Sequence, residues 1–306
     1  MKRKIWYCSL KHPISMNPMG KNVPYTDSQI SDLIAECINQ VIALTTPNTS
    51  LTAKMRGILD DAIRYCLKHN RRSLINVRDY IANLKGDNET RDGLLARMNF
   101  ILNDESMIKI LCGADSIDWG NLIKNRETFI LDASAMSREK MIFVGNIVSQ
   151  GIKNYFRYST PKDYLPVSLY IDECHNFVNS NMFDILKEGR KYKMSCCLAS
   201  QDFALIDPAL ARVMLNVGNI VAYKVGYREA NLVARELGMA HEDLQFLEKY
   251  HVAYLTTKMS GIAKAPHPPF FLDRQPPEKV EPQRQAIKPS WFTIDEIDAP
   301  ASYQSA

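Results

Sequence analysis

From Glu127 to Arg274, short apolar runs rich in β-branched residues alternate with helical patterns. The runs lie at 127–134, 167–173, 195–201 and 219–225. Strands that alternate with helices predict βαβ units, because parallel neighbours need a crossover connection. We therefore expect an α/β fold with a mostly parallel sheet flanked by helices. Its adjacent strands would be 128–132, 168–172, 196–200 and 220–224.

The region before this core has a different pattern. Residues 26–112 read as helical and carry no strand signal. Thr26 and Asp27 can cap a first helix. The apolar positions that follow at helical spacing predict one buried stripe, formed by Ile30, Leu33, Ile34, Cys37, Ile38, Val41 and Ile42. We interpret 26–112 as an all-α subdomain, and 1–25 as the first strand of the core and a connector.

The last part of the chain divides into a hairpin and a tail. Apolar runs at 250–258 and 262–272 flank a short turn at Met259–Gly261 and predict two antiparallel strands. After Arg274 the chain becomes rich in proline, glutamine and charge, which is typical of a flexible tail. The α/β core is thus predicted at 113–274 and the tail at 275–306.

Composition limits the class of protein. The chain has 306 residues, of which 46% are hydrophobic and 24% charged, and this excludes a fibrous or wholly disordered protein. The net charge of +4 permits a nucleic-acid partner without requiring one. No apolar run is long enough to span a membrane. The seven cysteines are odd in number and lack CxxC spacing, which predicts reduced thiols in a cytoplasmic protein.

The strongest chemical feature is the run SLYIDECHNF at 168–177, where a buried-strand pattern leads directly into Asp172 and Glu173. Parallel strands deliver their carboxyl ends to the ligand edge of a sheet. In a nucleotide hydrolase, Asp172 can hold Mg²⁺ through water and Glu173 can polarise the attacking water. The alternative is a strand that ends in two solvated acids.

Two further polar residues accompany this pair. The next run ends on Gln201, whose amide a neighbouring strand would bring near the γ-phosphate of a bound nucleotide. Between the two runs, LKEGRKYK carries Arg190, and a guanidinium suits the charge that develops on a transferred phosphoryl group. The alternative for Arg190 is a basic helix end stabilised by the helix dipole.

These motifs together resemble a known family. DE at 172–173, EGRKY at 188–192 and a strand that ends in SQ resemble the HerA/FtsK superfamily of ring-forming translocases. Within it, the chain is most similar to the type IV secretion coupling ATPases of the TraD/TraG type, which transfer DNA in conjugation. ETFILDAS, SMNPM and the segment 215–238 add to the likeness. It covers roughly 5–272 and is strongest over 166–240.

The resemblance implies a RecA-like P-loop NTPase core that carries an all-α domain and assembles as a homo-oligomer, a hexamer, around DNA. It implies ATP and Mg²⁺ as ligands. Asp172 and Glu173 would be the Walker B pair, Gln201 the sensor, and Arg190 an arginine finger that reaches the neighbouring subunit's nucleotide. It further implies the type IV secretion or transfer machinery as partner, with the chain at the inner face of the membrane through such partners.

One departure from the family is large. The phosphate loop GxxxxGK(S/T), whose backbone amides cradle the phosphates, is missing from the sequence. The only GK is Gly20-Lys21; it is followed by Asn22, and Ser15 stands at the position of the first glycine. We expect the loop to precede residue 1, so that the chain corresponds to the C-terminal part of a motor and is inactive alone.

Three functions remain open at this point. The chain is part of an ATP-driven DNA translocase, a catalytically inactive scaffold or assembly subunit derived from one, or part of an ATPase that moves protein. The basic cluster KHNRR at 68–72 can contact DNA phosphates or be a solvated helix end. Cys174 and His175, with Cys196 and Cys197, match no metal-ligand spacing.

Overall fold

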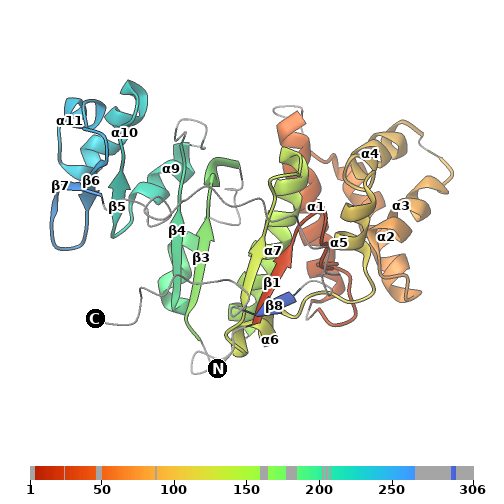
Figure 1. Cartoon of the computed structure of the whole chain (residues 1–306). Coiled ribbons are helices and arrows are strands. Elements are labelled where there is room, and N and C mark those ends of the chain that lie inside the picture. Colours follow the sequence, from red (N-terminus) through yellow and green to blue (C-terminus); the bar gives the residue numbers. More distant parts are fainter. Residues whose placement is uncertain are drawn as a thin grey trace, which may run out of the picture. The chain divides into compact units, whose positions relative to one another are not determined.

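A computed structural model describes residues 4–23, 25–45, 50–86, 88–158, 165–176, 185–201, 203, 206, 208–265 and 291–293. The chain forms two compact units (Figure 1). The first comprises Met1–Val167, Lys191–Ser195 and Lys288–Ala306, and the second comprises Ser168–Arg190 and Cys196–Ile287.

The sheet of the first unit has the order β2-β1-β8. Strand β1 (Lys4–Cys8) pairs in parallel with β2 (Thr128–Leu131), although more than a hundred residues separate them in sequence. On its other edge β1 pairs antiparallel with β8 (Trp291–Thr293). Strand β8 lies inside the range 275–306 predicted as a flexible tail, and the rest of that range lies outside the described residues.

Helices make up most of the first unit. They are α1 (Asp27–Thr45), α2 (Ala53–Lys68), α3 (Leu74–Ala82), α4 (Asn88–Ile101), α5 (Glu105–Cys112), α6 (Trp119–Lys124) and α7 (Arg138–Tyr158). Figure 1 shows α1 beside α7, and the two helices pack together. Within 26–112, the residues that the structure describes form only helices, turns and loops, whereas the domain boundaries remain predictions.

The first helix follows from its sequence. The Thr26 hydroxyl accepts a hydrogen bond from the Gln29 N–H (3.3 Å), and the Gln29 side chain accepts one from the Thr26 N–H (2.9 Å). This reciprocal capping satisfies amides that a helix start leaves unpaired. All seven residues of the predicted apolar stripe of this helix are buried. The connector before it is anchored by the fully buried Asn17, whose amide donates to the Arg72 carbonyl (2.8 Å) and to the Gly113 carbonyl (2.7 Å).

The second unit contains two sheets. Strands β3 (Val167–Ile171) and β4 (Met194–Leu198) form a pair, which belongs to this unit from Ser168 and Cys196 onward. Strands β5 (Ile220–Ala222), β6 (His251–Leu255) and β7 (Ser260–Lys264) form an antiparallel sheet in that order. The predicted hairpin is therefore confirmed over β6 and β7, and its residues after Ala265 lie outside the described part of the chain.

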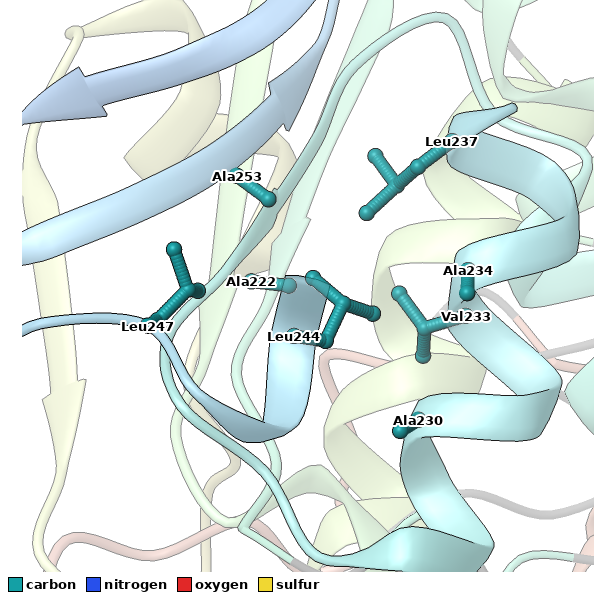
Figure 2. Packing of buried hydrophobic residues seen from close by; sticks show 8 residues of the cluster. All are labelled: Ala222, Ala230, Val233, Ala234, Leu237, Leu244, Leu247 and Ala253. Carbon is teal, nitrogen blue, oxygen red and sulfur yellow. The ribbon is translucent and has the colours of Figure 1, made fainter. Parts of the chain in front are cut away.

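The antiparallel sheet has a core of its own. Helices α10 (Tyr227–Leu237) and α11 (His241–Gln245) bury a small cluster against it (Figure 2). Gly238 ends α10 in the left-handed conformation (φ 66°) that a residue without a Cβ adopts readily. Helix α9 (Pro208–Leu215) precedes β5.

The sequence predicted that four strands are neighbours in one sheet, and this pairing is wrong. Among the described residues, the strands fall into three hydrogen-bonded groups: β2 pairs with β1, β3 with β4, and β5 with β6. Strand β5 is three residues long and takes its hydrogen bonds from the hairpin, which shares its apolar core. The pairs β1–β2 and β3–β4 are the parallel ones.

Candidate functional site

The candidate site lies where β3 and β4 end. The Val167 N–H donates to the Lys193 carbonyl (3.2 Å), and the Ala199 N–H donates to the Ile171 carbonyl (2.9 Å). From the first hydrogen bond to the second, the residue number increases in both strands, so the strands are parallel. Their carboxyl ends therefore meet at one edge, where open α/β sheets bind ligands.

The structure brings three of the four predicted site residues to this edge. Asp172 and Glu173 follow β3, and Gln201 follows β4 after two residues. The Gln201 amide nitrogen donates a hydrogen bond to Glu173 Oε1. The amide and the carboxylate are thus in direct contact across the two strand ends.

Asp172 is exposed at the edge of the sheet, where its Oδ1 accepts a hydrogen bond from the Glu173 N–H (2.9 Å). In the part of the chain that the structure describes, no group of three or more His, Cys, Asp or Glu side chains gathers to hold a metal ion. Mg²⁺ keeps several waters and takes one or two carboxylates together with phosphate oxygens. An exposed Asp172 beside Glu173 fits such an ion, with water and the nucleotide as its remaining ligands.

Glu173 has an unusual backbone. Its φ is 48°, in the left-handed region that costs a residue with a Cβ about 1–2 kcal/mol. The turn lets the chain leave β3 and direct the next amide inward, where the Cys174 N–H donates to the Ala199 carbonyl (2.8 Å). Cys174 is fully buried there, while the Glu173 side chain stays 35% exposed. Strain of this kind is found at functional sites.

His175 contacts Glu173, and the sequence did not predict this contact. Its Nδ1 lies 3.4 Å from Glu173 Oε2 and 3.2 Å from Ser200 Oγ, and its Nε2 lies 3.2 Å from the Asn176 amide nitrogen. An amide nitrogen is a donor, so the hydrogen-bond network assigns the ring proton to Nδ1. Both carboxylate oxygens of Glu173 thus face a donor, Gln201 on one side and His175 on the other. The one sequence signal for this contact was the position of the histidine two residues after the glutamate, in the turn η2 (Cys174–Asn176).

The thiols beside the site are unsuited to chemistry. Burial raises the pKa of Cys174 to about 11 and that of Cys196 to about 12. A thiol reacts as its thiolate, so both groups are inert near neutral pH.

Arg190 does not join the other three residues. It lies in η3 (Gly189–Tyr192), just before β4 begins, whereas Gln201 follows the other end of that strand. The five residues of β4, at about 3.3 Å each, separate the two ends by about 17 Å. Arg190 is exposed, and among the described residues it has no hydrogen bond or ion pair.

Solved structures share this architecture. No protein-family model matches the chain, and no curated protein matches its sequence. VirB4 of Thermoanaerobacter pseudethanolicus superposes with a TM-score of 0.63 at 13% identity, over 87% of this chain and 77% of that one. The bacterial conjugative coupling protein TrwB superposes with a TM-score of 0.61 at 12% identity, over 86% of this chain and 73% of its own, both unbound and in complex with ADP and Mg²⁺.

The chain has the fold of these proteins. The RecA-like α/β fold predicted from the sequence is thereby confirmed. At such low identity the likeness shows the fold and no more. No helix among the described residues is both long and apolar enough to cross a membrane.

Proposed function

We propose that the chain is part of an ATP-driven DNA translocase of the conjugative, type IV secretion coupling kind. The observation that carries the proposal is the placement of Asp172, Glu173 and Gln201 at the carboxyl edge of the parallel β3–β4 pair. The fold supports it, because TrwB with this fold has been solved with ADP and Mg²⁺ and with a non-hydrolysable ATP analogue.

Each residue at the edge has a role in this proposal. Mg²⁺ held through water by Asp172 would offset the charge of the phosphates. Glu173 orients the water that attacks the γ-phosphate. Gln201, which donates a hydrogen bond to Glu173, detects whether that phosphate is present. His175 fixes the second oxygen of the glutamate.

Arg190 acts on another subunit in this proposal. Its distance of about one strand length from Gln201 excludes direct contact with the edge of its own β3–β4 pair. An exposed guanidinium without an ion pair in the described structure is free to reach a phosphate on a neighbouring copy. The proposed assembly is a hexamer around DNA, in the cytoplasm at the inner face of the membrane, where it meets the transfer machinery.

A second function is favoured by one specific observation. The sequence contains no GxxxxGK(S/T) motif, so this chain lacks the loop that supplies the phosphate cradle. A chain that keeps the fold without that loop suits an inactive scaffold or assembly subunit. The coding sequence upstream separates the two functions: an in-frame phosphate loop within a few hundred codons supports the motor, and its absence supports the scaffold.

A mixing experiment on the loop-bearing protein tests the residue roles. Glu173→Gln and Arg190→Lys should each reduce ATP hydrolysis by about 10³-fold or more. Equal mixing of the two variants should restore part of the activity, because some interfaces then pair an intact Glu173 with an intact Arg190. Asn231→Ala, on the exposed face of α10, is the control and should hydrolyse ATP at the parent rate.

Mixed variants that stay as inactive as each alone would refute the role of Arg190 in a neighbouring subunit. Full activity of Glu173→Gln would refute the assignment of the site itself.

A further inference from the structure

The end of α2 presents positive charge without acidic partners. Arg64, Lys68 and Arg71 are all exposed, and in the described structure none of them forms an ion pair. Arg64 and Lys68 stand four residues apart, on one row of the helix surface. Arg71 follows in the link to α3, where its N–H donates to the Cys66 carbonyl (2.7 Å).

Several other cations of the helical region are neutralised by nearby carboxylates. Arg56 pairs with both Asp32 (2.6 Å) and Asp60 (2.8 Å), and Arg78 pairs with Asp79 (2.7 Å). The acid of α2 next to the unpaired cations is the exposed Asp61, one turn before Arg64 and Tyr65. The end of α2 therefore keeps a net positive charge that its own side chains do not neutralise.

An aromatic array lies beside these cations. The Tyr65 ring is stacked on Tyr80 of α3, with centroids 4.4 Å apart and planes at 29°. Its other neighbour is His69, with centroids 4.3 Å apart. His69 is exposed, and its ring contact in the described structure is the one with Tyr65, so its imidazole is accessible from solvent. The row Tyr65–His69 runs next to the row Arg64–Lys68 on the same helix.

We propose that this surface, which we call the α2–α3 tip (Arg64, Lys68, His69 and Arg71, with Tyr65 and Tyr80 behind the imidazole), binds single-stranded nucleic acid. Cations that follow a backbone and an aromatic face on which a base stacks are the two parts of a sequence-tolerant single-strand site. A duplex keeps its bases stacked on one another and offers none to His69. The inference does not rest on the nucleotide site, which lies in the other compact unit.

Fluorescence anisotropy of the full chain with a labelled oligothymidylate, over a series of salt concentrations, tests the proposal. Each phosphate contact on a single strand contributes about 0.7 to the slope of log affinity against log salt. The triple variant Arg64→Gln, Lys68→Gln, Arg71→Gln should therefore lower the slope by about 2 and the affinity at 0.1 M salt by about 100-fold. A duplex of the same length should bind more weakly than the single strand.

The chain offers a matched charge control. Lys21, Lys124 and Arg126 are exposed and unpaired in the described structure, and Lys124 ends α6 as Lys68 ends α2. Their triple replacement by glutamine removes the same charge and should leave the slope unchanged. Equal losses in both triple variants would refute the site, since they would reflect overall charge alone.

The imidazole is tested separately from the charges. His69→Ala should weaken binding about fivefold or more without changing the salt slope, because a stacked base is lost and no phosphate contact. His69→Phe keeps a ring and should restore most of the affinity. Unchanged affinity in His69→Ala, or tighter binding of the duplex than of the single strand, would overturn the proposal.

Discussion

The left-handed backbone of Glu173 gives a prediction with an unusual sign. At ordinary positions, replacing alanine by glycine destabilises a protein by roughly 0.5–1 kcal/mol, because glycine loses more freedom on folding. Glu173 has φ 48°, where a residue with a Cβ costs about 1–2 kcal/mol. The gain from removing the Cβ exceeds the entropic loss. Glu173→Gly should therefore be more stable than Glu173→Ala.

The size of this stability difference is the cost of a Cβ at positive φ minus the entropic cost of glycine. We expect the glycine variant to be more stable than the alanine variant by roughly 0.5–1 kcal/mol. Both variants lose the hydrogen bond from Gln201 and the contact with His175, so these losses cancel in the comparison. Asn231, in the middle of α10, is the control: there glycine should be less stable than alanine by about 1 kcal/mol.

Hydrogen exchange of the peptides that contain β3 and β4 measures this difference, because it reports the opening free energy of this part of the chain rather than that of the other unit. The same measurement on α10 serves the control pair. If glycine is no more stable than alanine at residue 173, the left-handed turn carries no strain, and the link between strain and the site is refuted.

Three further predictions concern chemistry and pH. The 306-residue chain alone should hydrolyse Mg-ATP far below about 1 s⁻¹, measured by phosphate release, because it lacks a phosphate loop. Iodoacetamide at pH 8 should label the exposed Cys197 but not Cys174, whose pKa of about 11 leaves about 0.1% thiolate; peptide mass spectrometry checks this. Hydrogen bonds from Ser134 and Tyr7 lower the pKa of Asp132 to about 2. Because the pKa of Asp132 is lower in the folded state than its ordinary value of 3.8, the ionised carboxylate stabilises the fold at pH values above 3.8, and this stabilisation is lost as the pH falls toward 2. Tyr7→Phe should therefore lose less stability than the parent between pH 5 and 2, as measured by denaturation at each pH.

Local pattern was enough to predict the helices and the hairpin. The stripe from Ile30 to Ile42 is buried as its spacing indicates, because a helix places residues three and four apart on one face. The choice of strand partners was not predictable in the same way. Strand β1 takes β2 and β8, which lie far away in the sequence, and β5 takes the hairpin rather than β4. Such pairings depend on three-dimensional packing that no single run of residues encodes.

The part of the site that lies at the carboxyl ends of strands was predictable from the sequence. A buried run that leads into acids, followed by a run that ends on an amide, places Glu173 and Gln201 at one edge if the strands are parallel neighbours. The contact of His175 depends on the left-handed turn at Glu173, and no residue type near it announces that turn. Glycine or asparagine would have done so.

The same turn bears on the choice between motor and scaffold. For the backbone alone, glycine would make the left-handed turn at residue 173 at a lower cost than glutamate. The glutamate instead keeps a half-exposed carboxylate between two donors, at the edge where a nucleotide would bind. That arrangement costs backbone energy, and it leaves the carboxylate placed as the proposed motor requires of a group that orients water. In the proposed motor, the phosphate loop would come from another segment and the arginine from a neighbouring subunit, whereas this chain contributes Glu173.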